Sequence, residues 1–375
     1  MKKSLLLLAL GAMGFGAQAA SVTLYGTADG ALSYQYSKQE FNGASNRDQT
    51  YGLESGALSS SKFGLKGVEE LGNGYSVGFK LENGFNLDDG RFSTGDRLFG
   101  REAALTVAGP FGELAAGRMG ALSSGAGTYD IFQANADVFD GGVGSIGAGY
   151  WNATSRYDNM LTYATPDMAG FKAYAQYSFA ANGTEDGNER NNDRYWGVGA
   201  TYNVGALGLV AVVDSVMPES GTADHDSYTV SLGGNYDFGT FKPFIGAQYG
   251  KHMSIFGVLN NHADEFSRGD IKGYAVSAGS IFNTSFGELS AGLFWARADG
   301  SGLYENEEGV KVATTLDNVD TYGVGLVNAY PLSKRTKLYA GVGATYSRGD
   351  VTYGEATSKY KETNAQALVG LSHQF

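Results

Sequence analysis

The sequence predicts an all-β fold, specifically an antiparallel transmembrane β-barrel of 16 strands. Three observations lead to this prediction: glycine is abundant, apolar and polar residues alternate with a period of two in many segments, and short and long connections follow one another in turn. Such alternation places apolar side chains on one face of a strand and polar side chains on the other. A sheet whose apolar face meets lipid must close on itself, because lipid offers no partner to unpaired backbone groups.

The composition supports this fold class. The 375 residues include 57 glycines, 24 tyrosines, 21 phenylalanines, 5 prolines and no cysteine. Glycine weakens helix interiors, which argues against a mostly helical fold, and so many aromatic residues argue against disorder. Without cysteine there is no disulfide, cysteine-ligated zinc or thiol nucleophile. The formal charge of −12 argues against a nucleic-acid partner, which would require clustered positive charge.

Residues 1–19 are expected to be a secretory signal peptide. Lys2 and Lys3 supply the positive start, an apolar run follows, and Ala17 and Ala19 are small residues at the positions that a signal peptidase reads. The run is shorter than the ~20 residues that a spanning helix needs. The mature chain, 20–375, is expected to form a single barrel domain, and its formal charge becomes −14 because two lysines are lost.

The segment 228–238 illustrates the alternation. Tyr228, Val230 and Leu232 share one face with the aromatic residue that ends the segment, Phe238, whereas the residues between them are mainly polar. Aromatic residues at both ends of an apolar face are typical of strands that cross a bilayer. By the same criterion, strands are expected at 22–37, 59–70, 74–86, 98–109, 113–121, 156–165, 171–180, 194–205, 207–217, 227–238, 241–254, 271–285, 287–298, 319–333, 336–349 and 364–375.

The connections between these strands alternate in length, as in up-and-down membrane barrels. Long loops are expected at 38–58, 122–155, 181–193, 255–270 and 299–318, and three of the five prolines fall at or beside the short turns. A soluble β-sandwich, a solenoid or an adhesin would also show alternation. Those folds do not require ten-residue strands throughout or aromatic residues at the strand ends.

Five segments resemble the general porins of Neisseria and Burkholderia. They are 21–27, 61–74, 98–102, 332–336 and 370–375, which read SVTLYGT, SKFGLKGVEELGNG, LFGRE, LSKRT and GLSHQF. The resemblance implies a homotrimeric 16-stranded barrel in the outer membrane, with membrane lipid and lipopolysaccharide around it. It also implies a long loop folded into the lumen and passive diffusion of ions and small hydrophilic solutes. In this family the final residue, here Phe375, resembles the signal that the assembly machinery reads.

The longest connection, 122–155, is the candidate constriction loop. It carries Asp130, Asp137 and Asp140 and no basic residue, and its segment 128–132 offers apolar anchors. In a diffusion channel the relevant chemistry is pore width and the charge along the walls. These carboxylates, together with Glu82, are therefore expected to form the acidic side of a constriction.

Basic residues on polar strand faces are expected to form the opposite wall. Alternation places Lys62, Lys66, Lys80 and Arg156 toward the lumen, and the resemblance implies that Lys62, Arg101 and Arg156 form the basic cluster across from the loop. Arg101 conflicts with strict alternation, which puts it on the lipid face with Leu105, unless a bulge or a rim position turns it inward. Ion preference stays open, because the basic wall favours anions and the net charge favours cations.

Other functions find weaker support, and no catalytic residue, metal or cofactor is expected. The segment 142–147 matches G-x-G-x-x-G, but no helical pattern follows it, as dinucleotide binding would require. The Asp224, His225 and Asp226 triplet could support base catalysis, although an exposed acidic loop explains it better. A sugar-specific channel and a receptor role of the loops are alternatives that the sequence leaves open.

Overall fold

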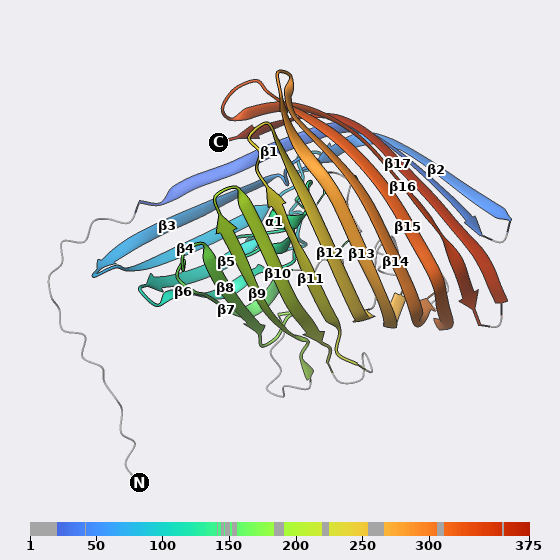
Figure 1. Ribbon diagram of the computed structural model, residues 1–375, viewed down its shortest axis with the longest axis horizontal. Coiled ribbons are helices and arrows are strands. Elements are labelled where there is room, and N and C mark those ends of the chain that lie inside the picture. Colours follow the sequence, from blue (N-terminus) through green and yellow to red (C-terminus); the bar gives the residue numbers. More distant parts are fainter. Residues whose placement is uncertain are drawn as a thin grey trace, which may run out of the picture.

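Seventeen β-strands and one short α-helix make up the regular structure in the computed structural model, which describes residues 21–41, 43–140, 142–143, 146, 151, 156–183, 191–219, 225–253, 266–305, 311–354 and 356–375 (Figure 1). The elements are β1 (Thr23–Phe41), β2 (Ala44–Ser55), β3 (Lys62–Gly72), β4 (Tyr75–Gly84), β5 (Glu102–Gly109), β6 (Gly112–Gly120), α1 (Phe132–Ala136), β7 (Arg156–Ala164), β8 (Phe171–Ser178), β9 (Arg194–Val204), β10 (Leu207–Met217), β11 (Tyr228–Tyr236), β12 (Phe241–Met253), β13 (Phe266–Thr284), β14 (Gly287–Glu305), β15 (Lys311–Pro331), β16 (Thr336–Tyr353) and β17 (Ala356–Gln374). The expected signal peptide lies outside the described residues.

The sheet closes into a barrel of 16 strands. From β3 to β17 each strand pairs antiparallel with the next, and β1 pairs with β17 on one edge and with β3 on the other. The extra strand β2 continues the β3 edge, where it pairs with residues 30–41 of β1. Phe375 extends the seam, because its backbone exchanges two 3.1 Å hydrogen bonds with Gly26. The expected closed 16-stranded barrel is thus confirmed.

Apolar side chains cover the outside of the barrel. Leu32, Ile245 and Leu293 leave 66, 65 and 63% of their surface exposed, whereas Phe294, the next residue after Leu293, is buried. Large apolar side chains exposed at every second position would be costly in water, at about 25 cal/mol per Å². Their arrangement around a closed sheet is that of a surface in contact with lipid. No helix in the described part of the chain is long and apolar enough to cross a membrane.

The strands differ in length around the barrel, and several expected boundaries were wrong. Strands β13 to β17 have 18–21 residues and form one tall side of the barrel, whereas β3 to β9 have 8–11 (Figure 1). The expected loops 38–58 and 299–318 are largely strand, and β17 begins at Ala356, well before its expected start. Beyond the bilayer a strand needs no apolar face, so pairing with a long neighbour sustains it where the alternation of apolar residues has ended.

Glycines on the inner face allow the loop between β6 and β7 to lie against the wall. A Cβ atom at Gly233 of β11 would come within 2.4 Å of the Ala136 Cβ of helix α1, and one at Gly246 of β12 within 2.8 Å of the Trp151 ring. Only glycine permits so close an approach without displacing the loop. Part of the unusual glycine content is therefore explained by packing inside the barrel.

Candidate functional site

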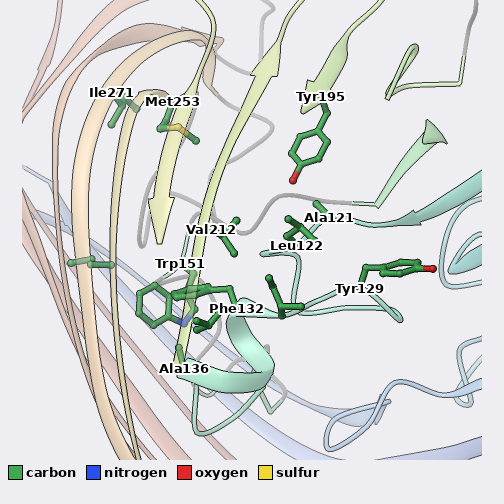
Figure 2. Packing of buried hydrophobic residues seen from close by; sticks show 14 of the residues in the cluster. Ala121, Leu122, Tyr129, Phe132, Ala136, Trp151, Tyr195, Val212, Met253 and Ile271 are labelled. Atoms are coloured by element: carbon green, nitrogen blue, oxygen red, sulfur yellow. The ribbon is translucent and has the colours of Figure 1, made fainter. Parts of the chain in front are cut away.

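The loop 122–155 enters the barrel and is anchored there by apolar packing. Ile131 and Phe132 are buried, and both of their amide groups donate to the Leu122 carbonyl oxygen, at 2.9 and 3.0 Å. The Phe132 ring meets the Trp151 ring edge-on with 5.1 Å between centroids (Figure 2). At the other end of α1, Asn235 of β11 donates to the Asn135 carbonyl oxygen at 2.8 Å. Ile131 and Phe132 also share one buried apolar cluster with Val210 and Val212 of β10, so the anchors expected at 128–132 hold the loop to the inner wall.

A polar contact fixes the loop to the opposite side of the barrel. The buried Glu102 carboxylate at the start of β5 accepts hydrogen bonds from Thr128 Oγ1 at 2.6 Å and from the Thr128 amide at 3.2 Å. Lys80 Nζ on β4 donates to the same carboxylate at 2.9 Å and to Thr128 Oγ1 at 3.0 Å. We call these three residues the latch. Bonds to a buried charged group are the stronger class of hydrogen bond.

Arg101 faces the lumen, although strict alternation puts it on the lipid face. It lies in the bend just before β5, so the alternation of that strand does not apply to it. Its Nε donates to Glu82 Oε1 of β4 at 2.8 Å, and the Tyr25 hydroxyl donates to the other oxygen of Glu82 at 2.9 Å. Lys80 Nζ is 3.8 Å from the same carboxylate.

Glu82 therefore does not lie on the acidic side, where we expected it. In the register Glu82 lies opposite Gly64 of β3 and Glu102 of β5. Lys62, Lys80 and Arg101 lie around it, because each is one or two residues from one of these three positions along its own segment. Its charge compensates these cations. Asp137 also differs from the expectation: it is buried, follows α1, and accepts from the Trp151 indole at 3.3 Å and the Phe139 amide at 3.0 Å. Its role is to shape the loop.

The remaining basic residues, Lys66 and Arg156, lie at different heights on the inner face of the barrel. Lys66 shares the inward face with Lys62, but it is exposed and stacks over the Tyr25 ring at 5.2 Å. Arg156 begins β7 opposite Gly120, and its Nε is buried without a hydrogen bond to any described residue. Lys62, Lys80, Arg101 and Arg156 are together called the basic wall.

A cavity of about 340 Å³ lies between part of the basic wall and the loop. Lys62 and Arg101 line one side, and Asp130 and Asp140 line the other. Opposite charges therefore meet across one water-accessible space, whose third side is formed by residues 58–60.

The cavity changes charge near neutral pH. Burial in the protein and the negative charge of Asp140 raise the pKa of Asp130 to about 7. A carboxyl with this pKa is protonated below pH 7 and negative above it. The loop side of the cavity thus carries less negative charge as the pH falls.

Residues 56–61 form an inward excursion that the sequence did not reveal. They lie between β2 and β3, opposite Ala28 and Asp29 of β1, and interrupt the pairing along that edge. The buried Asp29 carboxylate accepts from the Leu58 amide at 3.2 Å and from the Tyr339 hydroxyl at 2.7 Å, and the Asp29 backbone exchanges two hydrogen bonds with Ser61 Oγ. In the sequence, apolar and polar residues do not alternate over 56–61, so this segment looks like the end of an ordinary loop.

A second charged cluster also escaped the sequence analysis. Arg97, in the connection between β4 and β5, and Arg118 of β6 both contact Asp158 of β7, at 2.8 and 2.7 Å. In the sequence, these three residues are marked only by being charged and close to the ends of strands. Within the described residues, no group of three or more metal-binding side chains comes together.

A closed barrel with an apolar outer face, a loop packed inside it and charged walls around a cavity is the architecture of a membrane channel. The chain matches the sequence model described as Gram-negative porin over residues 5–350. It is 31% identical to an outer membrane porin protein of Bordetella pertussis and 29% identical to outer membrane porin protein 32 of Delftia acidovorans, each over the full length of both chains.

Solved structures agree. The barrel is similar to an anion-selective porin from Comamonas acidovorans, with a TM-score of 0.68 and 25% identity over 95% of this chain and 100% of that one. The chain therefore belongs to the Gram-negative porin family, as its sequence segments indicated. It is a porin of the outer membrane, and it forms a diffusion channel for ions and small hydrophilic solutes.

Proposed function

We propose that the space between the basic wall and the two loop carboxylates is the selective constriction of this porin. The observation that carries the proposal is that Lys62 and Arg101 line the same cavity as Asp130 and Asp140. Fixed charges of opposite sign across a narrow, protein-lined passage produce a transverse field, which acts on every ion that passes.

We further propose that this constriction weakly favours anions. Glu82 and Glu102 offset only part of the positive charge of the four basic-wall residues, and Asp130 is partly protonated at neutral pH because its pKa is about 7. The similarity to a porin described as anion-selective supports the same sign. The net charge of the whole chain is a poor guide, because a narrow passage responds mainly to the charges that line it.

The test is the reversal potential of single channels in a planar bilayer under a KCl gradient. Wild-type channels should reverse on the anion side of zero, and the Lys62→Glu and Arg156→Glu double variant should shift toward the cation side. Lys334→Glu, which reverses one charge in the exposed turn between β15 and β16, should leave the potential unchanged. The proposal fails if the double variant and Lys334→Glu behave alike.

We propose that the protein acts without catalysing a reaction. The family and its structural relatives are channels. The suspected catalytic triplet offers little support: Asp224 lies outside the described residues, and the His225 ring lies against the His252 ring, tilted by 42° with 4.5 Å between centroids. Stepwise conductance without hydrolysis of ester or peptide substrates is the expected result, and hydrolysis without conductance would overturn it.

We propose that the porin is a homotrimer surrounded by membrane lipid and lipopolysaccharide. A similar barrel, OmpT of Vibrio cholerae, is described in a trimer form, and the apolar outer surface supports a lipid environment. Mass measurement in detergent should give three chains per particle.

We also propose that the signal peptide is cleaved after residue 19 and that Phe375 acts in assembly. The amino-terminal sequence of membrane-extracted protein should begin at Ala20. Phe375→Ala should reduce the amount of folded barrel.

A further inference from the structure

Two aromatic belts mark where the bilayer meets the tall side of the barrel. Tyr249, Tyr274, Tyr322 and Tyr346 are exposed on the outer face of β12, β13, β15 and β16, and Trp295 of β14 continues their row. Nearer the short turns, the rings of Phe238, Phe241 and Phe282 stack on one another. Nine residues from Tyr274 to Phe282 join the two belts, which is the length of strand that crosses a bilayer.

A row of charged residues follows directly above the upper belt. On β13, β14, β15 and β16, the outward position two residues beyond the belt residue is occupied by Lys272, Arg297, Asp320 and Arg348. The register confirms that the row is continuous, because Arg297 pairs with Asp320 and Asp320 with Arg348. The alternate, inward positions are buried. This row lies at the depth of the lipid head groups.

The members of the row are not equivalent. Arg297 binds Asp320 through two bonds, at 2.8 and 2.7 Å, so this pair is internally compensated. Asp299, paired in register with Lys272, accepts from the Asn318 amide at 2.7 Å. The side chains of Lys272 and Arg348 are exposed, and neither side chain has an ion pair or hydrogen bond to another described residue. The Arg348 guanidinium lies 5.9 Å from the centroid of the Tyr322 ring, which holds it against the wall.

We propose that Lys272 and Arg348 bind the phosphate groups of an outer-leaflet lipid whose acyl chains lie on the apolar band below. A planar guanidinium matches phosphate in two hydrogen bonds, and an ammonium supplies a compact second charge. The arrangement favours a lipid over a soluble anion, because the cations stand directly above a lipid-facing surface, where acyl chains add apolar contacts that a free anion lacks. The inference rests on the proposed lipopolysaccharide environment but not on the pore.

The test compares binding of bisphosphorylated lipid A, its dephosphorylated form and inorganic phosphate to the purified porin by native mass spectrometry. Wild-type protein should retain the phosphorylated lipid preferentially, and the Lys272→Gln and Arg348→Gln double variant should bind it about tenfold less tightly. Lys337→Gln, which removes one exposed cation at the other end of β16, is the control for position and should bind like wild type.

Planar-bilayer conductance separates this proposal from the proposed pore. The double variant should conduct like wild type, since its substitutions lie outside the barrel; loss of conductance would indicate a folding defect, and Lys272→Arg with Arg348→Lys would then test the site with its charges kept. The inference is overturned if the double variant retains the phosphorylated lipid like wild type, if Lys337→Gln weakens binding equally, or if inorganic phosphate displaces the lipid at equal concentration.

Discussion

The latch leads to a prediction about the stability of the constriction loop. Thr128→Val keeps the shape of the side chain but removes the hydroxyl that donates to Glu102 at 2.6 Å and accepts from Lys80 at 3.0 Å. A hydrogen bond to a charged group contributes about 1.5–3 kcal/mol. Since 1.4 kcal/mol is a factor of ten, a loss of about 2 kcal/mol would raise the population of the undocked loop roughly 30-fold.

Hydrogen exchange measures this population directly. The amides of Ile131 and Phe132 are protected by the Leu122 carbonyl oxygen in the docked loop, so their exchange should accelerate by about the same factor. Single channels of the variant should also show more current flicker. Thr128→Ser retains the hydroxyl and should behave like wild type, and Thr106→Val, on β5, is a control for the change of residue type. Unchanged exchange in Thr128→Val would refute the role of the latch.

Three further predictions concern the pore and its packing. Anion preference should increase as the pH falls from 8 to 6, because Asp130, with a pKa of about 7, loses its negative charge over that range; Asp130→Asn should remove the dependence, and a reversal potential flat with pH would contradict the assignment. Gly233→Val places a Cβ 2.4 Å from α1 and should cost about 1–3 kcal/mol, measured as a lower Tm, whereas Gly52→Ala in open space should not; equal Tm values would contradict the packing argument. Tyr339→Phe removes a 2.7 Å bond to buried Asp29 and should loosen residues 56–61, seen as faster amide exchange at Leu58; unchanged exchange would show that the excursion does not depend on that bond.

Much of the fold could be predicted because alternation is a local property. Each residue of a membrane strand faces either lipid or lumen, so a segment such as 227–238 carries its own evidence, and β11 (Tyr228–Tyr236) lies where it was expected. Strand ends beyond the bilayer carry no such signal. The long extensions of β13 to β17 therefore became visible only through their pairing with neighbouring strands.

The functional site was harder to predict from the sequence than the fold. The loop 122–155 was identified by its length and its aspartates. The partners of the charged residues could not be predicted, because a charged side chain pairs with residues that are distant along the chain. Glu82 lies among the basic-wall residues and accepts a hydrogen bond from Arg101, and Asp137 accepts one from Trp151 within its own loop.

The sequence by itself thus determined that this chain is a closed membrane barrel, which of its faces meets lipid, and which loop is long enough to enter it. These conclusions depend on the spacing of apolar residues along a single strand. Only the tertiary structure decided that Arg101 faces inward, that residues 56–61 narrow the lumen, and that Tyr339 holds Asp29 from 310 positions away. Closure of the barrel brings such distant residues together, and no pattern within one strand encodes that contact.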